Sequence, residues 1–214
     1  MRSFLNSIRK PINISLPKKV IYPVLFLIVG FISGVFAKML DETPSNTLPY
    51  FLELLDLGNF FSRMGVWIFI TVIISLYSKS PMRSGVNVFL FLSGMVGSYY
   101  LYTVFIVGFY PKSYMMIWIG MTFISPLLAF ICWYAKGKGT IAIFISSIIF
   151  MSLSRQSFAF GFWYFDIAYV LEFILLIIMT FILYQSPKQI IQVIIIGILL
   201  FLITAQINLF WGIL

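Results

Sequence analysis

Seven long apolar runs make up most of the chain, and they constrain its fold more than any other feature. Most of them approach or exceed the roughly 20 residues that a helix needs to cross about 30 Å of hydrocarbon. The runs cover about residues 20–37, 58–77, 86–109, 114–134, 140–153, 162–184 and 190–214. The chain is 62% hydrophobic and 9% charged, whereas soluble domains are about 25% charged. We therefore predict an all-α fold, an integral membrane bundle of about seven transmembrane helices.

Several kinds of site are excluded by residues that the chain lacks. It has no histidine and one cysteine, Cys132, so imidazole metal sites, Ser-His-Asp triads and intrachain disulfides cannot form. An intramembrane aspartyl protease needs two aspartates at membrane depth, and the apolar runs contain only Asp166. We therefore predict a protein that is not an enzyme and has no cofactor and no bound metal.

The net charge of +8 does not indicate a nucleic-acid partner, because the basic residues lie between the apolar runs. That distribution is typical of membrane orientation. Ten basic residues fall on the side of the N-terminus: Arg2, Arg9, Lys10, Lys18, Lys19, Lys79, Arg83, Lys136, Lys138 and Lys188. The remaining four are Lys38, Arg63, Lys112 and Arg155. The asymmetry predicts a cytoplasmic N-terminus and, after seven crossings, an extracellular C-terminus.

We divide the chain into a basic N-terminal segment, 1–19, and a single transmembrane bundle, 20–214. Pro11 and Pro17 disfavour one continuous helix through the first segment. The first apolar run ends in Val35–Ala37, which resembles a signal-peptide cleavage site. Because the run fills a whole membrane width, we interpret it as an uncleaved anchor.

A short helix is expected in the longest connection between runs. Pro49 suits a first helical turn, and Gly58 suits a helix end. Residues at about 49–57 are apolar except for Glu53 and Asp56, which share one face. This pattern predicts an extracellular helix that lies at the membrane interface.

Two carboxylates fall within the sixth run, where an ionisable side chain costs at least ~2.5–3.5 kcal/mol unless a partner offsets it. A rise of about 1.5 Å per residue from the start of the run puts Asp166 about 6 Å deep and Glu172 about 15 Å deep. Spaced three apart, Asp166, Tyr169 and Glu172 would form one polar stripe. Arg155 and Arg63 are the candidate partners. The stripe is either an ion-binding site or a set of ion pairs that fix helix register.

Small residues in the first and third runs suggest close helix packing. Gly30 and Gly34 form a G-x-x-x-G motif, which is a packing or dimerisation signal. In the third run, Gly94 and Gly97 each have a serine four residues away. We therefore expect a neighbouring helix to approach the third run at both glycines.

Two tyrosines of the third run extend towards the end where the sixth-run carboxylates begin. Tyr99 and Tyr102 would lie on adjoining faces of the helix. They either line an outward-facing polar pocket or belong to an aromatic belt at the membrane interface.

Several motifs carry a resemblance to a known group of proteins. They are SGMVGSYYLYT (93–103), GFYPKSY (108–114), SPLLA (125–129), CWYAKGKG (132–139) and FGFWYFD (160–166). In these motifs the chain resembles a family of uncharacterised multi-pass membrane proteins of low-GC Gram-positive bacteria. The resemblance covers about half of the chain and implies no activity. It implies a location in the bacterial plasma membrane.

Two functions remain open at this stage. The first is transport or recognition of a small solute or ion, in a pocket between the second, third and sixth runs. The chain is similar in size to substrate-binding subunits of energy-coupling-factor transporters, although those usually have six helices. A partner membrane subunit or ATPase would then be expected, besides the lipid bilayer. The alternative is a non-catalytic scaffold or interaction subunit whose intramembrane polar residues are structural.

Overall fold

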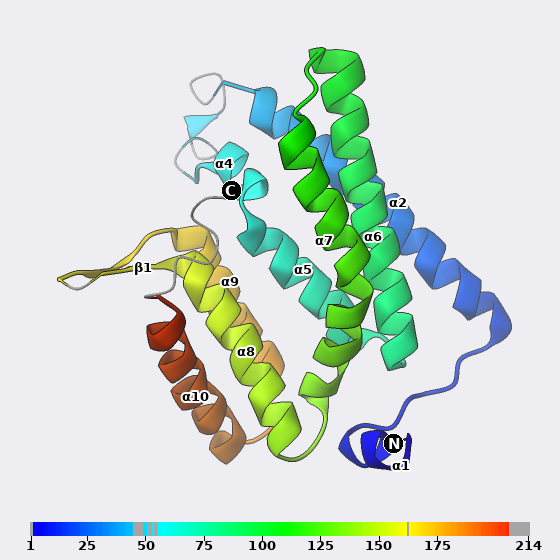
Figure 1. The fold of residues 1–214 in the computed structure, drawn as a ribbon, viewed down its shortest axis with the longest axis vertical. Coiled ribbons are helices and arrows are strands. Elements are labelled where there is room, and N and C mark those ends of the chain that lie inside the picture. The colour runs from blue at the N-terminus through cyan, green and yellow to red at the C-terminus, as the bar shows by residue number, and fades with distance from the viewer. Residues whose placement is uncertain (1, 45–48, 51–52, 54, 162, 206–214) are drawn as a thin grey trace.

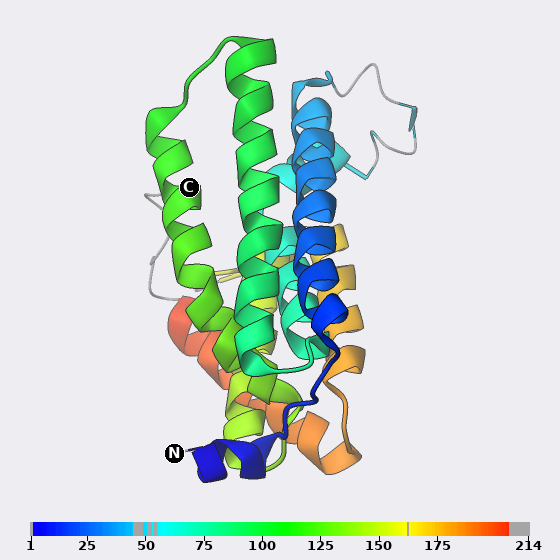
Figure 2. The same ribbon diagram turned by 90° about the vertical axis from the view of Figure 1, so that its right-hand side faces the viewer.

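The computed structural model describes residues 2–44, 49–50, 53, 55–161 and 163–205 as a bundle of long helices with one small hairpin (Figures 1 and 2). The helices are α1 (Arg2–Ile8), α2 (Leu16–Glu42), α4 (Leu57–Ser62), α5 (Met64–Tyr77), α6 (Pro81–Tyr102), α7 (Lys112–Cys132), α8 (Thr140–Ser157), α9 (Val170–Leu183) and α10 (Pro187–Ala205). A π-helical turn, η2 (Thr103–Val107), extends α6, and a 3-10 turn, η3 (Trp133–Lys136), extends α7. Strands β1 (Phe158–Phe160) and β2 (Phe165–Ile167) pair in antiparallel fashion.

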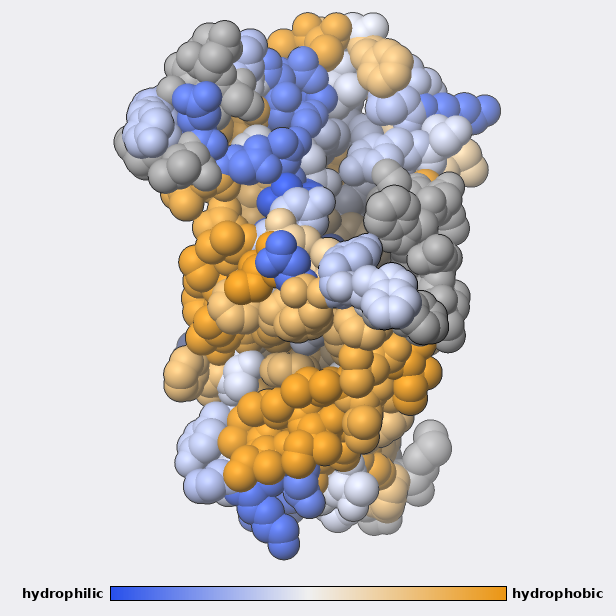
Figure 3. All heavy atoms as spheres, turned by 90° about the vertical axis from the view of Figure 1, so that its left-hand side faces the viewer, coloured by the Kyte–Doolittle hydropathy of each residue, from blue (hydrophilic) through white to orange (hydrophobic). Residues whose placement is uncertain are grey.

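Five of the described helices are long and apolar enough to cross a membrane: α2, α6 with η2, α7 with η3, α8 and α10. Helices α5 and α9 are also apolar but have 14 residues each, which is about 21 Å at ~1.5 Å per residue. Figure 3 shows an apolar band with hydrophilic side chains above and below it on one face. The helical, membrane-compatible architecture is thus confirmed, and the count of seven crossings stays a prediction.

We name the two ends of the bundle after short helices that lie there, the α4 end and the α1 end (Figure 1). At the α1 end, the N-terminal segment folds under the bundle. Ile8 is buried, and the Arg9 guanidinium donates to the backbone oxygens of Trp133 at 2.5 Å and Leu76 at 2.9 Å. The expected break in this segment is confirmed, although Pro17 lies in the first turn of α2.

Helix α5 lies at the centre and shares its side chains between two hydrophobic clusters (Figure 1). Val72 and Leu76 pack with residues of η3, α8, α9 and α10. Val66, Trp67 and Ile74 pack with residues of α2, α6 and α7. The two halves of the bundle therefore meet along α5, which contributes side chains to both hydrophobic clusters.

Helices α2 and α6 approach each other closely along a line of small residues. A Cβ atom at Gly30, Gly34 or Gly94 would overlap a backbone oxygen of the facing helix. The Ser98 hydroxyl donates to the Phe31 carbonyl oxygen across this contact at 2.8 Å. The G-x-x-x-G motif thus packs against another helix of the same chain.

The expectation for Gly97 is wrong. A Cβ atom built there meets nothing within 4 Å among the described residues. Gly94 and Ser98 face α2, whereas Gly97 is exposed and has no helix beside it among the described residues.

The expected sixth span is wrong in its first part, while the all-α fold class is confirmed apart from one small hairpin. Residues before Val170 form the β1–β2 hairpin instead of a helix. This stretch is rich in aromatic residues, which favour strands. Its turn is closed by the Gly161 N–H, which donates to the Tyr164 oxygen at 2.9 Å. Phe158 stacks on Phe165 at 5.0 Å between ring centroids.

The expected interfacial helix at about 49–57 falls partly on residues 51, 52 and 54, which lie outside the described residues. The expected end at Gly58 is wrong, since Gly58 lies inside α4. Asp56 precedes α4 in the left-handed region, with φ 51°. The expected second span is also divided, because the chain leaves the helical conformation at Arg63 between α4 and α5.

Candidate functional site

Two of the charged side chains that sequence analysis singled out, Arg63 and Glu172, meet at the break between α4 and α5. Arg63 has φ −83° and ψ 158°, an extended conformation. Its N–H donates to the Asn59 carbonyl oxygen at 3.0 Å, which closes α4. The break turns the chain from one helix into the next and places the Arg63 side chain beside the start of α9.

Arg63 forms an ion pair with Glu172. Its Nε donates to Oε1 at 2.5 Å, and a terminal nitrogen donates to Oε2 at 3.4 Å. The Glu172 side chain is 1% exposed, whereas that of Arg63 is 20% exposed. A planar guanidinium suits this two-point contact with a carboxylate better than an ammonium group does. Glu172 is therefore a paired carboxylate, as its position in an apolar run requires.

The continuous helix from residue 162 that gave the expected depth of Glu172 is wrong, because α9 starts at Val170. Glu172 is the third residue of the helix. In the first turn the backbone N–H groups lack intrahelical partners and the helix dipole favours a negative charge. The beginning of α9 and the Arg63 guanidinium thus both stabilise the Glu172 carboxylate.

Space for the Glu172 side chain exists because residue 65 is a glycine. A Cβ atom at Gly65 would lie 2.8 Å from Cγ of Glu172 and 3.4 Å from Cβ of Gln156. Helix α5 therefore touches α9 at this point through backbone alone. The ion pair is enclosed by packed atoms on this side.

Two further residues contact Arg63. A terminal nitrogen lies 3.4 Å from Oδ2 of Asp56. The guanidinium carbon lies 4.0 Å from the centroid of the Tyr169 ring, which is a cation–π distance. We call Asp56, Arg63, Tyr169 and Glu172 the Arg63 cluster.

A second cluster of charged residues lies at the same end, on α2, α4 and α6. Lys38, 7% exposed, pairs with Asp41 at 2.8 Å and also with Glu42. Asp41 accepts hydrogen bonds from the hydroxyls of Ser62 and Tyr99, each at 2.9 Å. We call these five residues the Lys38 cluster.

Helix α4 connects the two clusters. Ser62, its last residue, contacts the Lys38 cluster, and Arg63 directly after it contacts the Arg63 cluster. Asn59 on the same helix donates to Oδ1 of Asp56 at 2.7 Å. The Phe61 carbonyl oxygen accepts from the Trp67 indole N–H at 2.9 Å. The short helix is thus held in place by side chains from both sides.

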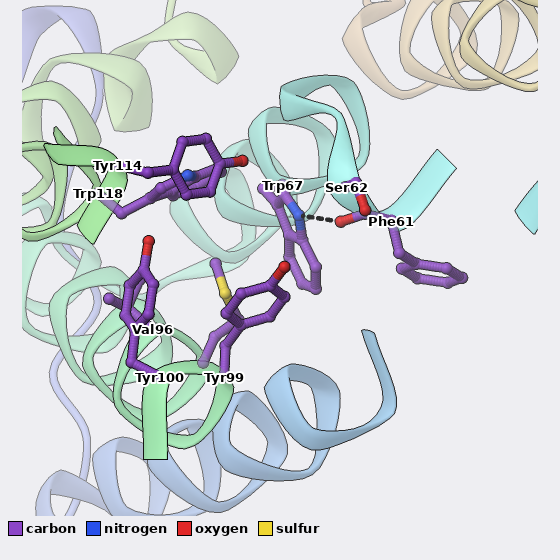
Figure 4. Close-up of a pocket in the computed structure, with 9 residues that line it drawn as sticks. Phe61, Ser62, Trp67, Val96, Tyr99, Tyr100, Tyr114 and Trp118 are labelled. Atoms are coloured by element: carbon purple, nitrogen blue, oxygen red, sulfur yellow. Dashed lines mark hydrogen bonds between the residues drawn. The ribbon is translucent and has the colours of Figure 1, made fainter. Parts of the chain in front are cut away.

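A narrow cavity lies between α4, α5, α6 and α7 (Figure 4). Its volume is about 20 Å³, room for about one water molecule. Residues around it include Trp67, Tyr99, Tyr100, Tyr114 and Trp118. The Tyr100 hydroxyl is buried and has no hydrogen-bond partner within the described parts of the chain. A single water would satisfy it, whereas a solute would not fit.

The structure therefore brings together four of the seven residues expected at the site, but in two clusters. Glu172, Tyr169 and Arg63 belong to the Arg63 cluster, and Tyr99 belongs to the Lys38 cluster. Tyr102 lies on the last turn of α6, outside both clusters.

The other two expected residues lie elsewhere. Asp166 is an exposed residue of β2, and its Oδ1 accepts the Ile167 N–H at 2.7 Å. The expected helical stripe from Asp166 to Glu172 is therefore wrong, because the chain is not helical before Val170. Arg155 does not pair with Glu172. It donates to the Thr204 carbonyl oxygen at 2.7 Å, near the end of α10.

Sequence reasoning missed Lys38, Asp41, Ser62 and Gly65 as site residues. A signal for the first two was present, because Lys38 precedes Asp41 by three positions and Glu42 by four, the spacing of ion pairs on a helix. Nothing in the local sequence indicates that Gly65 contacts the Glu172 side chain of α9. Within the described ranges, no group of three Asp, Glu, Cys or His side chains could hold a metal ion.

Comparisons with known proteins give no relative: no family model, no curated protein and no solved structure matches the chain. The resemblance to uncharacterised membrane proteins of low-GC Gram-positive bacteria therefore stays a prediction. What the chain does has to be argued from its own geometry.

Proposed function

We propose that the chain is a non-catalytic scaffold or interaction subunit of the bacterial plasma membrane, whose polar residues at the α4 end are structural. One observation carries this proposal. Glu172 is 1% exposed and both its carboxylate oxygens face Arg63. An ion-binding carboxylate needs free oxygens and a path to water, and this one is occupied by a side chain of its own protein.

The surroundings of the pair support the same reading. Gly65 fills the space beside Glu172 with backbone. The cavity next to the Lys38 cluster has room for about one water molecule. The carboxylate oxygens of Asp41 accept hydrogen bonds from one lysine and two hydroxyl groups. The charged groups thus hold α2, α4, α5, α6 and α9 together and leave little for a solute to bind.

The proposed membrane arrangement is multi-pass, with a cytoplasmic N-terminus and an extracellular C-terminus. Ten basic residues on one side against four on the other support this orientation. Helices α5 and α9, about 21 Å long, would cross where the bilayer is locally thinned. The aromatic hairpin beside α9 suits the interface, where Trp and Tyr gather; its Trp163 is 95% exposed.

A second candidate function is recognition or transport of a cation, together with a partner subunit or ATPase. The observation that favours it is charge. The Lys38 cluster contains one cation and two carboxylates, and so does the Arg63 cluster. Each therefore has a formal charge of −1, and a negative end attracts cations.

Reconstitution into vesicles separates the two candidates. The purified chain and its Glu172→Gln variant are placed in vesicles that contain a pH-sensitive dye, and proton- and potassium-driven dye responses are recorded. The scaffold proposal expects no flux above empty vesicles and a less stable variant. Flux through the native chain that Glu172→Gln abolishes, without loss of stability, would establish the transport function instead.

A further inference from the structure

A groove lies on the other half of the bundle, away from both charged clusters. Helices α9 and α10 both pack against α8, and the groove lies between them, with a volume of about 440 Å³. Its floor contains buried side chains, among them Phe150, Leu176 and Phe201. Its rim contains exposed ones, among them Ile177 and Ile198. The groove is therefore a cleft in the surface and not a sealed void.

The wall of the groove offers no free hydrogen-bond donor to an occupant, judged from its described side chains. Its only hydroxyl groups belong to Ser154 and Thr180, judged from the described side chains that line it. Ser154 donates to the Phe150 oxygen at 2.9 Å, and Thr180 donates to the Leu176 oxygen at 2.8 Å. Both hydroxyls are turned to their own helices. An occupant of this groove is therefore hydrocarbon, since a dry apolar cavity does not hold water.

The two ends of the groove differ. At the α1 end, the short connection of residues 184–186 brings α9 and α10 together. At the hairpin end, the rings of Phe158, Phe165 and Phe201 close it: Phe158 lies 5.0 Å from Phe165 and 6.2 Å from Phe201, between centroids. The exposed side chains of its rim, Ile177 and Ile198, lie on the apolar helices α9 and α10. If these helices are embedded in the bilayer, a hydrocarbon chain enters the groove from the membrane.

A basic side chain stands beside the hairpin end. Arg155 directly follows Ser154, which lines the groove. A guanidinium nitrogen of Arg155 donates to the Thr204 carbonyl oxygen, two residues after Leu202, which also lines the groove. It makes no ion pair with a described carboxylate. A guanidinium has five donors in a fork that fits phosphate. Arg155 therefore supplies the charge that a phosphate group beside the groove would require.

The size of the groove suits a lipid tail. The groove has about 440 Å³, which is within the range of pockets for small ligands, ~300–1,000 Å³. A helix as long as α9 is a cylinder of at least 10 Å diameter and about 21 Å length, on the order of 1,600 Å³, so it could lay only one face into the groove. One extended acyl chain can lie inside it.

We propose that this groove binds one acyl chain of a membrane phospholipid, with the lipid phosphate held by Arg155. The site is separate from the charged clusters and does not depend on whether the protein is a scaffold or a transporter. A bound lipid would fill the space between α9 and α10 and join them to the hairpin.

A phospholipid with a photoreactive diazirine in one tail tests the proposal on the native chain in vesicles. After illumination, peptides that carry the lipid are identified by mass spectrometry. We expect labelling of 173–181 and 194–202 to exceed labelling of the exposed face of α2, such as Phe31 and Ile32, by at least fivefold. Equal labelling of both faces would overturn the proposal, because bulk lipid covers all exposed apolar side chains alike.

Two neighbouring residues of α9 give a matched pair of variants. Ile177 lines the groove and is 41% exposed, whereas Ile178 does not line it and is 42% exposed. Ile177→Trp should fill the groove and lower its labelling at least fivefold, and Ile178→Trp should leave it unchanged. Equal labelling in the two variants would contradict the groove as the binding site. The thermal midpoint of each variant shows whether it is folded.

The phosphate half of the proposal is tested at Arg155. Arg155→Gln should lower groove labelling several-fold and Arg155→Lys less, while Lys112→Gln at a distant exposed site should have no effect. Glycerol phosphate carries the headgroup without tails, and we expect it not to compete at concentrations where phospholipid does. Competition by glycerol phosphate would show a soluble anion site. A cross-link from a photoreactive residue at Ile198 to residues 206–214 would show that the chain's own C-terminal segment occupies the groove.

Discussion

Arg63 and Glu172 are 109 residues apart in the sequence, yet their side chains form a two-point ion pair between the start of α5 and the start of α9. Glu172 is almost fully enclosed, and Arg63 keeps a second acidic neighbour, Asp56. The pair is therefore asymmetric. Removal of Arg63 leaves a buried charge with no partner, whereas removal of the Glu172 charge leaves an arginine that still contacts Asp56.

This asymmetry predicts unequal effects of two charge-removing variants. Arg63→Gln should lower the free energy of unfolding in detergent by about 3–5 kcal/mol, the cost of an unpaired buried charge. Glu172→Gln should cost less, about 1–3 kcal/mol, since a neutral amide still hydrogen-bonds. Lys112→Gln at the same end is the control and should change stability by less than ~0.5 kcal/mol. An Arg63→Gln effect equal to the control would show that the pair contributes nothing.

Gly65 should be sensitive to the smallest possible change. A methyl group there would press on Cγ of Glu172 from 2.8 Å, so Gly65→Ala is expected to destabilise by about 1–3 kcal/mol through overpacking. Gly97→Ala adds the same methyl group where nothing lies within 4 Å of it. It should be neutral or stabilise by up to ~1 kcal/mol through helix propensity. Thermal unfolding of both variants in one detergent makes the comparison.

The contact between α2 and α6 gives a stronger test of the same kind. Gly94→Leu places a branched side chain against backbone atoms of α2 and should separate the helices, which lowers the thermal midpoint by many degrees. Gly97→Leu should be tolerated. Equal midpoints for the two leucine variants would mean that Gly94 is not at a helix contact.

Asp41 is the acceptor that holds the Lys38 cluster together. Asp41→Asn removes its charge while three donors remain around it, and we expect a loss of about 1.5–3 kcal/mol. Tyr99→Phe removes one of those hydrogen bonds and should cost about 0.5–1.5 kcal/mol. Tyr102→Phe is the matched control on the same helix and should have no effect. If the Tyr99→Phe variant is as stable as the control, the hydrogen bond from Tyr99 to Asp41 does not contribute to stability.

The orientation can be tested by cysteine labelling of intact cells in a Cys132→Ser background. Lys138 and Tyr164 are exposed and lie in connections at opposite ends of α8. With a membrane-impermeant maleimide, Tyr164→Cys should be labelled at once and Lys138→Cys only after permeabilisation. The reverse result would place the N-terminus outside.

The amino-acid sequence by itself determined where most of the helices are. Long apolar runs favour helices, because a helix pairs its backbone N–H and C=O groups within the segment, as hydrocarbon requires. An acidic residue in such a run is costly without a partner, and Glu172 is paired. The spacing of Gly30 and Gly34 in the first run likewise predicted a close helix contact, and both glycines face backbone atoms of α6.

Tertiary structure decided which residues meet. Arg63 and Arg155 were both candidate partners of Glu172 by sequence. In the structure, the extended conformation of residue 63 directs the Arg63 side chain to Glu172 at the start of α9. Arg155 instead donates a hydrogen bond to the Thr204 oxygen of α10. The start of α9 at Val170 could not be predicted from the sequence either. An aromatic apolar stretch is compatible with a strand and with a helix, and only pairing with a second strand decides between them. Pairing across more than a hundred residues depends on how helices cross, and no local pattern encodes that.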